Sequence, residues 1–428
     1  MRALRLSSIA LIVASGACTK TSDKYCGLHP EDTEHCSAGD AGDAGGACEV
    51  NGDCTSPGLS VCTTGGTCAQ CDDNDHDACM GTTPVCDATD HACRKCELDA
   101  ECSSGVCGDD GSCADESMVA YVAAQGSGMT CTKSAPCADL DAAEKTMKPQ
   151  IRVAGTVTEA VTAGFMTGTR TITGEGATVQ VMGSMAAIKV GNAGTNLTIR
   201  GLTFTSIAGA DLEQPMIMVT ASGPRLELDR VTIAHGKYTA LDSQRNAIVI
   251  IHRSVFASNE AGPAMTLLGG EYEVTNSLFV GNGANDSSVG GVSLFPRADA
   301  TMHTFAFNTV ADNNSSRSSG RSTGIVCTNA TLSNSIVVGN MLTNCDGDYL
   351  VWNTGDGSPQ HTPHGTGIVM AEPAFANDAD LASPMFYRLG PTSPALDAAD
   401  PAATMPNDID GEPRPAHGRS DIGADERQ

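Results

Sequence analysis

One short pattern recurs along the second half of this chain, and its clearest copy is Leu228-Asp229-Arg230-Val231-Thr232-Ile233. Gly, Asn, Ser and Asp separate the copies. Successive copies lie 29, 24, 23, 32 and 26 residues apart, so a constant strand motif alternates with loops of variable length. The copies align at Arg200, Asp229, Arg253, Asn276, Asn308 and Asn334, within Ile199–Phe204, Leu228–Ile233, His252–Phe256, Asn276–Phe279, Asn308–Val310 and Asn334–Val337.

Alternating apolar side chains inside the copies predict a narrow aliphatic interior, filled by residues such as Leu226, Leu228, Val231 and Ile233. In the last four copies a second Asn follows six positions on. Asn tolerates the left-handed backbone of a tight turn, and stacked Asn side chains can hydrogen-bond along the axis. We therefore predict an all-β parallel β-helix, a solenoid of about eight to ten coils over residues 151–375. The four Asn residues are Asn259, Asn282, Asn314 and Asn340.

The composition excludes other repeat folds and two classes of partner. Leucine-rich repeats need a regular leucine spacing, and a propeller needs aromatic blade motifs, whereas only 4% of this chain is aromatic. The 51 acidic and 25 basic residues give a formal net charge of −26, which repels nucleic-acid phosphates and anionic lipid headgroups. After residue 17 no apolar stretch approaches the roughly 20 residues of a membrane-spanning helix. We expect neither nucleic-acid binding nor an integral membrane protein.

The N-terminus predicts export. Residues 1–17 combine two arginines, an apolar run and a small-residue exit, as secretory signal peptides do. Ser15-Gly16-Ala17 before Cys18 resembles a bacterial lipoprotein signal, which implies that Cys18 is lipidated and anchors the chain to a membrane. Ser15 stands where this signal commonly has Leu, so plain secretion stays the alternative. Residues 18–47 would form the anchor and a flexible tether.

The cysteines predict a second, small module. Nineteen cysteines leave an even eighteen after Cys18, and in an exported chain such groups indicate disulfides. Twelve form three four-cysteine units in residues 48–115, a segment too poor in apolar residues to build a core. The connectivity is open, and the spacings Cys68-x2-Cys71 and Cys93-x2-Cys96 keep zinc as an alternative. The predicted disulfide cysteines are Cys26, Cys36, Cys48, Cys54, Cys62, Cys68, Cys71, Cys79, Cys86, Cys93, Cys96, Cys102, Cys107, Cys113, Cys131, Cys137, Cys327 and Cys345.

Two regions resemble a known family. Val119–Gly128 with Ala135–Ala143 looks like the N-terminal segment of bacterial right-handed parallel β-helix proteins of the pectin-lyase-like superfamily. The resemblance implies right-handed coils, with a first strand and a capping helix in residues 116–150, the helix at Leu140–Met147. Residues 376–428 are similar to the terminal motif of choice-of-anchor surface β-helix proteins, which implies a C-terminal capping tail. That motif comprises Ser393–Asp400, Asp408–Pro415 and Asp421–Glu426.

Enzymes of this superfamily work on polysaccharides in a groove along one sheet, and one constellation in this chain suits such chemistry. Asp229 and Arg253 would lie side by side on neighbouring coils, with Lys237 in the turn between them. In a polysaccharide lyase Lys237 or Arg253 would be the base and Asp229 a charge-neutralising group. A glycoside hydrolase is also open. The alternative is a surface ladder of alternating charge, Arg200 over Asp229 over Arg253, without catalysis.

We therefore predict a cell-surface lipoprotein of the outer membrane, or else a secreted protein. Its β-helix would bind glycans or another cell surface, or serve the envelope structurally. Catalysis as a lyase or glycosidase is the alternative, and an inert spacer is a third. We expect a monomer without a metal or cofactor. Calcium is the alternative at the tail carboxylates of Asp408–Gly411 and Asp421–Gly423, or in the acidic loop Asp72–Asp77.

Overall fold

The computed structural model describes residues 47–428, apart from residue 57 and residues 73–77, 183–184, 208–213, 284–288, 314–322, 341–343 and 354–361. The predicted signal peptide and nearly all of the tether, with Cys18, Cys26 and Cys36, lie outside the described residues, as does Asn314. Within the described part, no helix is long and apolar enough to cross a membrane. The described residues divide into two compact units, which we call the disulfide module and the solenoid unit: the described residues up to Cys102 with Cys107–Cys113, and those of Ser103–Val106 with Ala114–Gln428.

The disulfide module repeats one pairing three times. In each four-cysteine unit the first cysteine bonds to the third and the second to the fourth, which confirms these disulfides and supplies the connectivity that the sequence left open. The pairs are Cys48–Cys62, Cys54–Cys68, Cys71–Cys86, Cys79–Cys93, Cys96–Cys107 and Cys102–Cys113. Between them lie only short elements: η1 Asn51–Asp53, β1 Val61–Cys62, β2 Cys68–Ala69, β3 Val85–Asp87, β4 Ala92–Arg94 and η3 Asp99–Glu101.

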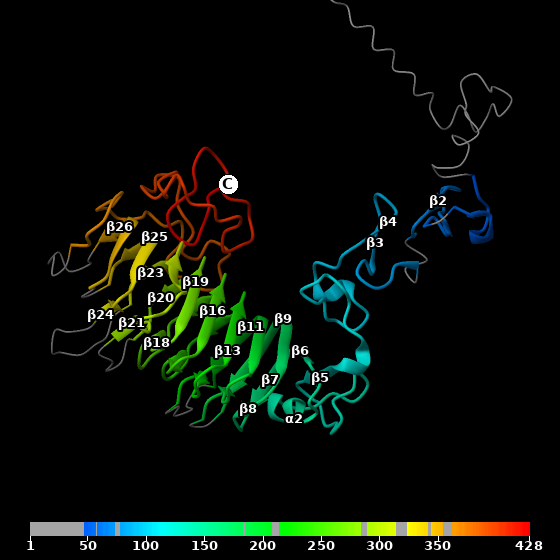
Figure 1. Ribbon diagram of the computed structural model, residues 1–428, viewed down its shortest axis with the longest axis horizontal. Coiled ribbons are helices and arrows are strands. Elements are labelled where there is room, and N and C mark those ends of the chain that lie inside the picture. The colour runs from blue at the N-terminus through cyan, green and yellow to red at the C-terminus, as the bar shows by residue number, and fades with distance from the viewer. Residues whose placement is uncertain are drawn as a thin grey trace, which may run out of the picture. The chain divides into compact units, whose positions relative to one another are not determined.

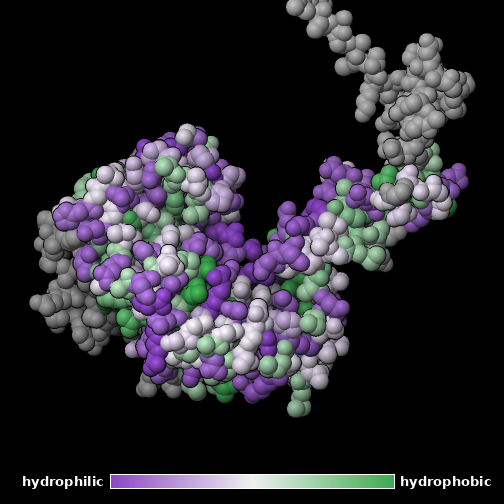
Figure 2. Space-filling model, in the orientation of Figure 1, coloured by the Kyte–Doolittle hydropathy of each residue, from purple (hydrophilic) through white to green (hydrophobic). Residues whose placement is uncertain are grey.

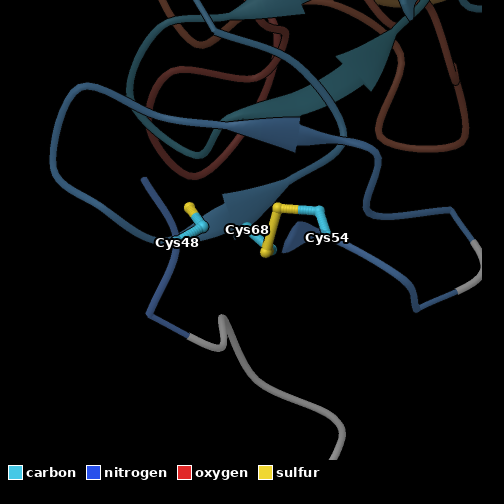
Figure 3. A group of neighbouring side chains, drawn as sticks. All are labelled: Cys48, Cys54 and Cys68. Carbon is cyan, nitrogen blue, oxygen red and sulfur yellow. A yellow bond between two sulfur atoms is a disulfide. The ribbon is translucent and has the colours of Figure 1, made fainter. Parts of the chain in front are cut away.

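The clustered sulfurs of the module are not free thiolates. Figure 3 shows Cys54 joined to Cys68 with Cys48 beside them, and Cys48 is itself bonded to Cys62. The cysteines of the two zinc-like spacings, Cys68-x2-Cys71 and Cys93-x2-Cys96, are also disulfide-bonded. Each of the four bonds to a partner within its own four-cysteine unit. Zinc binds thiolates, so these sulfurs are not available as its ligands.

The first and third units share a polar turn. The side-chain oxygens of Asn51 and Asp99 accept hydrogen bonds from the backbone N–H of Cys62 and Cys107, at 2.8 and 2.9 Å. Both acceptors stand three residues after the first cysteine of their unit. Equivalent side chains at equivalent positions show that the 24-residue period is a structural repeat.

The solenoid unit is a stack of parallel strands in about seven turns (Figure 1). One sheet has a single strand from each turn: β8 Ala163–Phe165, β10 Ile188–Val190, β12 Ile217–Val219, β15 Leu241–Gln244, β18 Met265–Leu268, β21 Val289–Phe295 and β24 Thr323–Cys327. The other sheet contains β5 Val119–Ala123, β6 Gln150–Ala154, β7 Thr156–Glu159, β9 Thr169–Val181, β11 Asn196–Ser206, β13 Arg225–Asp229, β14 Thr232–Ala234, β16 Ile248–His252, β17 Val255–Ala257, β19 Glu271–Thr275, β20 Leu278–Val280, β22 His303–Ala306, β23 Thr309–Ala311, β25 Thr331–Val338 and β26 Asp346–Asn353. The turns are fewer than the eight to ten predicted, because the chain after β26 no longer follows the full coil path.

The interior is filled as the alternation predicts. Leu226, Leu228, Val231 and Ile233 are all completely buried, which confirms their inward direction. Phenylalanines stack along the axis in later turns, with ring centroids 4.8 Å apart from Phe256 to Phe279 and 5.9 Å apart from Phe279 to Phe305. Stacking at the strand spacing buries these rings without opening the narrow coil.

A buried asparagine ladder links four turns, and its third rung is Asn313 rather than the predicted Asn314. The sequence alignment is one residue out here because Phe307, not Asn308, takes the left-handed position that Asn276 takes one turn earlier. Each side-chain amide donates to the amide oxygen of the next rung, at 2.8, 2.9 and 3.1 Å. The rungs are Asn259, Asn282, Asn313 and Asn340.

A second ladder went unpredicted. Ser254, Ser277, Asn308 and Ser335 are completely buried, and each accepts a backbone N–H from the preceding turn. Asn308 therefore belongs to this row, which explains the misalignment. Short polar side chains at these positions satisfy backbone groups that the bend between two strands leaves unpaired.

Both open edges of the larger sheet are covered. Along β5, Tyr121 and Ala123 exchange backbone hydrogen bonds with the loop closed by Cys131–Cys137. Helix α2, Leu140–Lys145, is shorter than the predicted Leu140–Met147, and it buries Leu140 and Ala143 in the core. Met147 adopts a left-handed conformation, which ends the helix. The backbone of residues 364–369 pairs with β26 at the other edge, and the short helix η4, Glu116–Met118, precedes β5.

The C-terminal segment, coloured red in Figure 1, packs against the outer face of the later turns. Ile409, Ile422 and Ala424 are buried there in a second apolar cluster that includes Leu278 and Ile336. Because strands such as β20 and β23 are covered on both faces, every one of their residues is buried.

Candidate binding groove

A groove of about 1240 Å³ lies between the outer face of the solenoid and the C-terminal segment. We call it the tail groove. Its floor comes from four neighbouring strands, which extend about 14 Å along the axis at the usual strand spacing. The floor residues are Thr203, Thr205, Thr232, Ala234, Val255, Leu278 and Val280 with the turn residues His235, Ser258 and Gly281, and the wall residues are Asp378–Leu389, Asp410, Glu412 and Asp425–Gln428.

The floor changes from hydroxyl to aliphatic along the axis. Thr203 is level with Thr232, which is level with Val255 and then with Leu278. The earlier turns carry polar side chains on this face because the C-terminal segment does not cover them, whereas the later turns carry aliphatic ones that it buries. The groove lies at this boundary, and Figure 2 shows a mainly hydrophilic surface with small hydrophobic patches.

An arginine organises the wall. Arg388 donates to both carboxylate oxygens of Asp410, each at 2.6 Å, and lies 3.5 Å from Asp425. Asp425 also accepts the backbone N–H of Leu389 at 2.7 Å. A paired guanidinium holds these carboxylates in place at the rim of the groove.

Burial and like charges shift two acids of the wall. The pKa of Asp425 is raised to about 6, mainly by burial and in part by neighbouring Asp408 and Asp410, against the backbone N–H of Leu389 and the charge of Arg388, which lower it. Loss of solvation and the same two aspartates raise the pKa of Glu412. Protonation is therefore easier here than on an open surface.

The predicted terminal motif forms a network of hydrogen bonds beside the wall. Fully buried Asp408 accepts the backbone N–H of Asp410, Glu412 and Glu426. Arg414 is buried and pairs with Glu426 at 3.0 Å. These side chains satisfy backbone groups of a segment without regular strands, so their chemistry is structural.

The three residues predicted as catalytic do not line the tail groove. Asp229 is level with His252, since the step between their strands is 23 residues, and Arg253 reaches back to form two hydrogen bonds with Asp229 at 2.9 and 2.7 Å. Their predicted proximity is thus present through a diagonal ion pair. Lys237 pairs with Glu260 at 2.5 Å, one turn on. A catalytic role of Asp229, Lys237 and Arg253 stays a prediction.

The glycine beside His235 has a packing reason. Gly236 donates its backbone N–H to Asn259 Oδ1 at 2.9 Å, at the start of the asparagine ladder. A Cβ on Gly236 would lie 2.6 Å from that oxygen, so no other residue fits without displacing it. His235 itself is exposed on the groove floor.

One group of described carboxylates has the geometry of a cation site. Oxygens of Asp408, Asp410 and Asp425 lie within 4.8 Å of one another. Their present partners are backbone N–H groups and Arg388, which supply positive charge to the same oxygens. Calcium at the tail stays a prediction, and the acidic loop lies largely outside the described residues.

Comparison with solved structures finds a likeness to a pectate lyase. The crystal structure of pectate lyase Pel9A aligns with a TM-score of 0.39 at 14% sequence identity, covering 77% of this chain and 100% of that chain. No family model and no curated protein matches the sequence. A likeness of this extent bears on neither activity nor ligand.

Sequence reasoning missed the groove because its two sides are far apart in the chain. Thr203 and Asp425 line the same groove only because the C-terminal segment folds back over the solenoid. One signal was present: the later copies contain unbroken apolar triplets such as Leu278–Val280, where a half-exposed strand alternates. Such triplets indicate a second covering layer.

Proposed function

We propose that the solenoid unit binds an extended glycan in the tail groove. The observation that carries the proposal is the floor, where half-buried Thr203 and Thr232 adjoin the half-buried aliphatic side chain of Val255 beneath a wall rich in carboxylates. Sugar rings present hydroxyl groups and apolar faces together, so this surface suits them. Four strands in line suit a chain of linked sugars better than a single small molecule.

The proposal includes the location that the sequence predicts. The protein would be a monomeric cell-surface lipoprotein, held in the outer membrane through lipidated Cys18, or a secreted protein if Cys18 is unmodified. Its coils would be right-handed, with α2 as the cap of the stack. Glycan binding would attach the cell to another surface or to its own envelope. Mass spectrometry of the mature N-terminus tests the anchor.

A pair of matched variants tests the groove. Thr203→Arg places a long charged side chain on the floor, and Thr198→Arg makes the same change on the same strand, β11, at a half-buried position outside the groove. Using a glycan array and then titration calorimetry, we expect Thr203→Arg to weaken binding at least tenfold and Thr198→Arg to leave it unchanged. Equal binding by both variants would contradict the proposal.

Catalysis in the same groove is the second candidate. Asp425, with its pKa raised to about 6, adjoins Asp410, and glycoside hydrolases pair a protonated carboxyl group with an ionised one. New reducing ends from a polysaccharide panel, abolished by Asp425→Asn, would establish a hydrolase. Outside the tail groove, ultraviolet absorbance of unsaturated ends, abolished by Lys237→Ala, would establish a lyase at the predicted residues Asp229, Lys237 and Arg253 and overturn a binding-only role.

A further inference from the structure

The charges of the tail groove are divided unequally between its two sides. The floor consists of threonine, serine, alanine, glycine and aliphatic residues, with His235 as its titratable group. All six carboxylates of the lining come from the wall, as do its two arginines. The six are Asp378, Asp380, Asp410, Glu412, Asp425 and Glu426.

The wall keeps an excess of negative charge after its internal pairs are counted. Arg388 is committed to Asp410, and Glu426 is paired from behind by Arg414. Asp378, Asp380 and Glu412 remain exposed along the wall, against the exposed Arg427. Loss of solvation raises the pKa of Glu412, and the negative charges of Asp408 and Asp410 add to this shift.

This potential discriminates among glycans. A concave site with one sign of charge concentrates ligands of the opposite sign and rejects those of the same sign. Uronate polymers carry a carboxylate on each sugar, which the wall and the net charge of −26 would both repel. A polymer of amino sugars carries an ammonium group on each sugar instead.

We propose that the ligand of the tail groove is a glycan of amino sugars with free amines, whose ammonium groups face Asp378, Asp380 and Glu412 while its rings lie on the threonine and aliphatic floor. This inference rests on the proposed function. It goes further by assigning the charge class of the ligand to one wall and three side chains.

The test compares three oligosaccharides of equal length on the full mature chain: a glucosamine oligomer, its N-acetylated neutral counterpart and a galacturonate oligomer. Titration calorimetry at about pH 6 keeps the amines largely protonated. We expect the amine oligomer to bind roughly tenfold more tightly than the neutral one, with salt reducing the difference, and the galacturonate oligomer not to bind.

The double variant Asp378→Asn/Asp380→Asn should reduce that preference about threefold to tenfold, since each exposed ion pair contributes up to about 1 kcal/mol. The control Asp90→Asn/Asp109→Asn changes the net charge equally, at exposed positions of the disulfide module, and should keep the preference.

Tight galacturonate binding, or equal preference in the two double variants, would overturn the inference. If the neutral oligomer binds as tightly as the amine oligomer, the proposed glycan binding stands and this inference falls. If none of the three binds, while other glycans on the array do, the inference also falls; if no glycan binds, the proposed function falls with it.

Discussion

The disulfide module and the solenoid unit are each stabilised in a different way. In the module, six disulfides close loops of 11 to 15 residues around a cluster made mostly of cysteines themselves. In the solenoid unit, a continuous aliphatic and aromatic core runs through the turns, and its two disulfides are themselves packed within that core. The difference teaches that covalent links replace a core where the sequence has too few apolar residues to form one.

Reduction of the disulfides should have the largest effect, and it should affect the two units differently. A loop of about 15 residues gains roughly 3 kcal/mol from its disulfide, so losing six exceeds the whole stability of a small domain. Peptide-resolved hydrogen exchange in a thiol reductant should show the module unfolded and the core strands of the solenoid unit protected. If the strands β16 and β19 lost protection together with the module, the two units would not be independent.

The asparagine ladder sharpens the comparison within the solenoid unit. Asn282→Ala removes an amide that donates to Phe256 O at 2.8 Å and accepts from Asn259, which leaves buried backbone groups unpaired. We expect a loss of about 4 kcal/mol in the free energy of unfolding, measured with urea. The exposed Asn196→Ala should change it by less than about 0.5 kcal/mol. A loss below 1 kcal/mol for Asn282→Ala would show that solvent or neighbours replace the rung.

A buried acid in the first turn gives a smaller effect that depends on pH. Burial raises the pKa of Glu159 to about 8, against the backbone N–H of Leu140, which donates to its carboxylate. The folded-state pKa lies above the ordinary 4.5, so stability is full below pH 4.5 and decreases as pH rises toward 8. We expect a decrease of roughly 3 kcal/mol over this range.

Glu159→Gln should abolish most of that decrease while leaving the module unaffected, because Gln keeps the shape and stays neutral. Urea unfolding across the pH range measures it. Glu144→Gln, on the neighbouring helix at a half-buried position, is the comparison: burial also raises the pKa of Glu144, so this variant should remove a smaller part of the decrease than Glu159→Gln does. A decrease unchanged in Glu159→Gln would assign it to another group.

Local patterns predicted the repeating parts of this protein well. Each predicted strand copy lies in a strand or at the bend between two, and all sixteen described cysteines are in disulfides, although their pairing was open. The exceptions were positions where a loop shifts the phase. Phe307 takes the left-handed backbone position at which the sequence alignment placed Asn308. Asn308 therefore lies in the second ladder, and Asn313 instead of Asn314 lies in the asparagine ladder, because the backbone conformation, not the residue type, defines the turn.

The sequence by itself determined the repeat, the aliphatic interior and the covalent character of the module, since each depends on neighbours within one turn or one four-cysteine unit. Only the tertiary structure decided which outer faces are covered and where the tail groove lies. Asp425 and Thr203 line the same groove although more than two hundred residues of chain separate them. No local spacing encodes this arrangement, because it arises from apolar surface on Leu278 and Ile336 packing against a distant apolar segment.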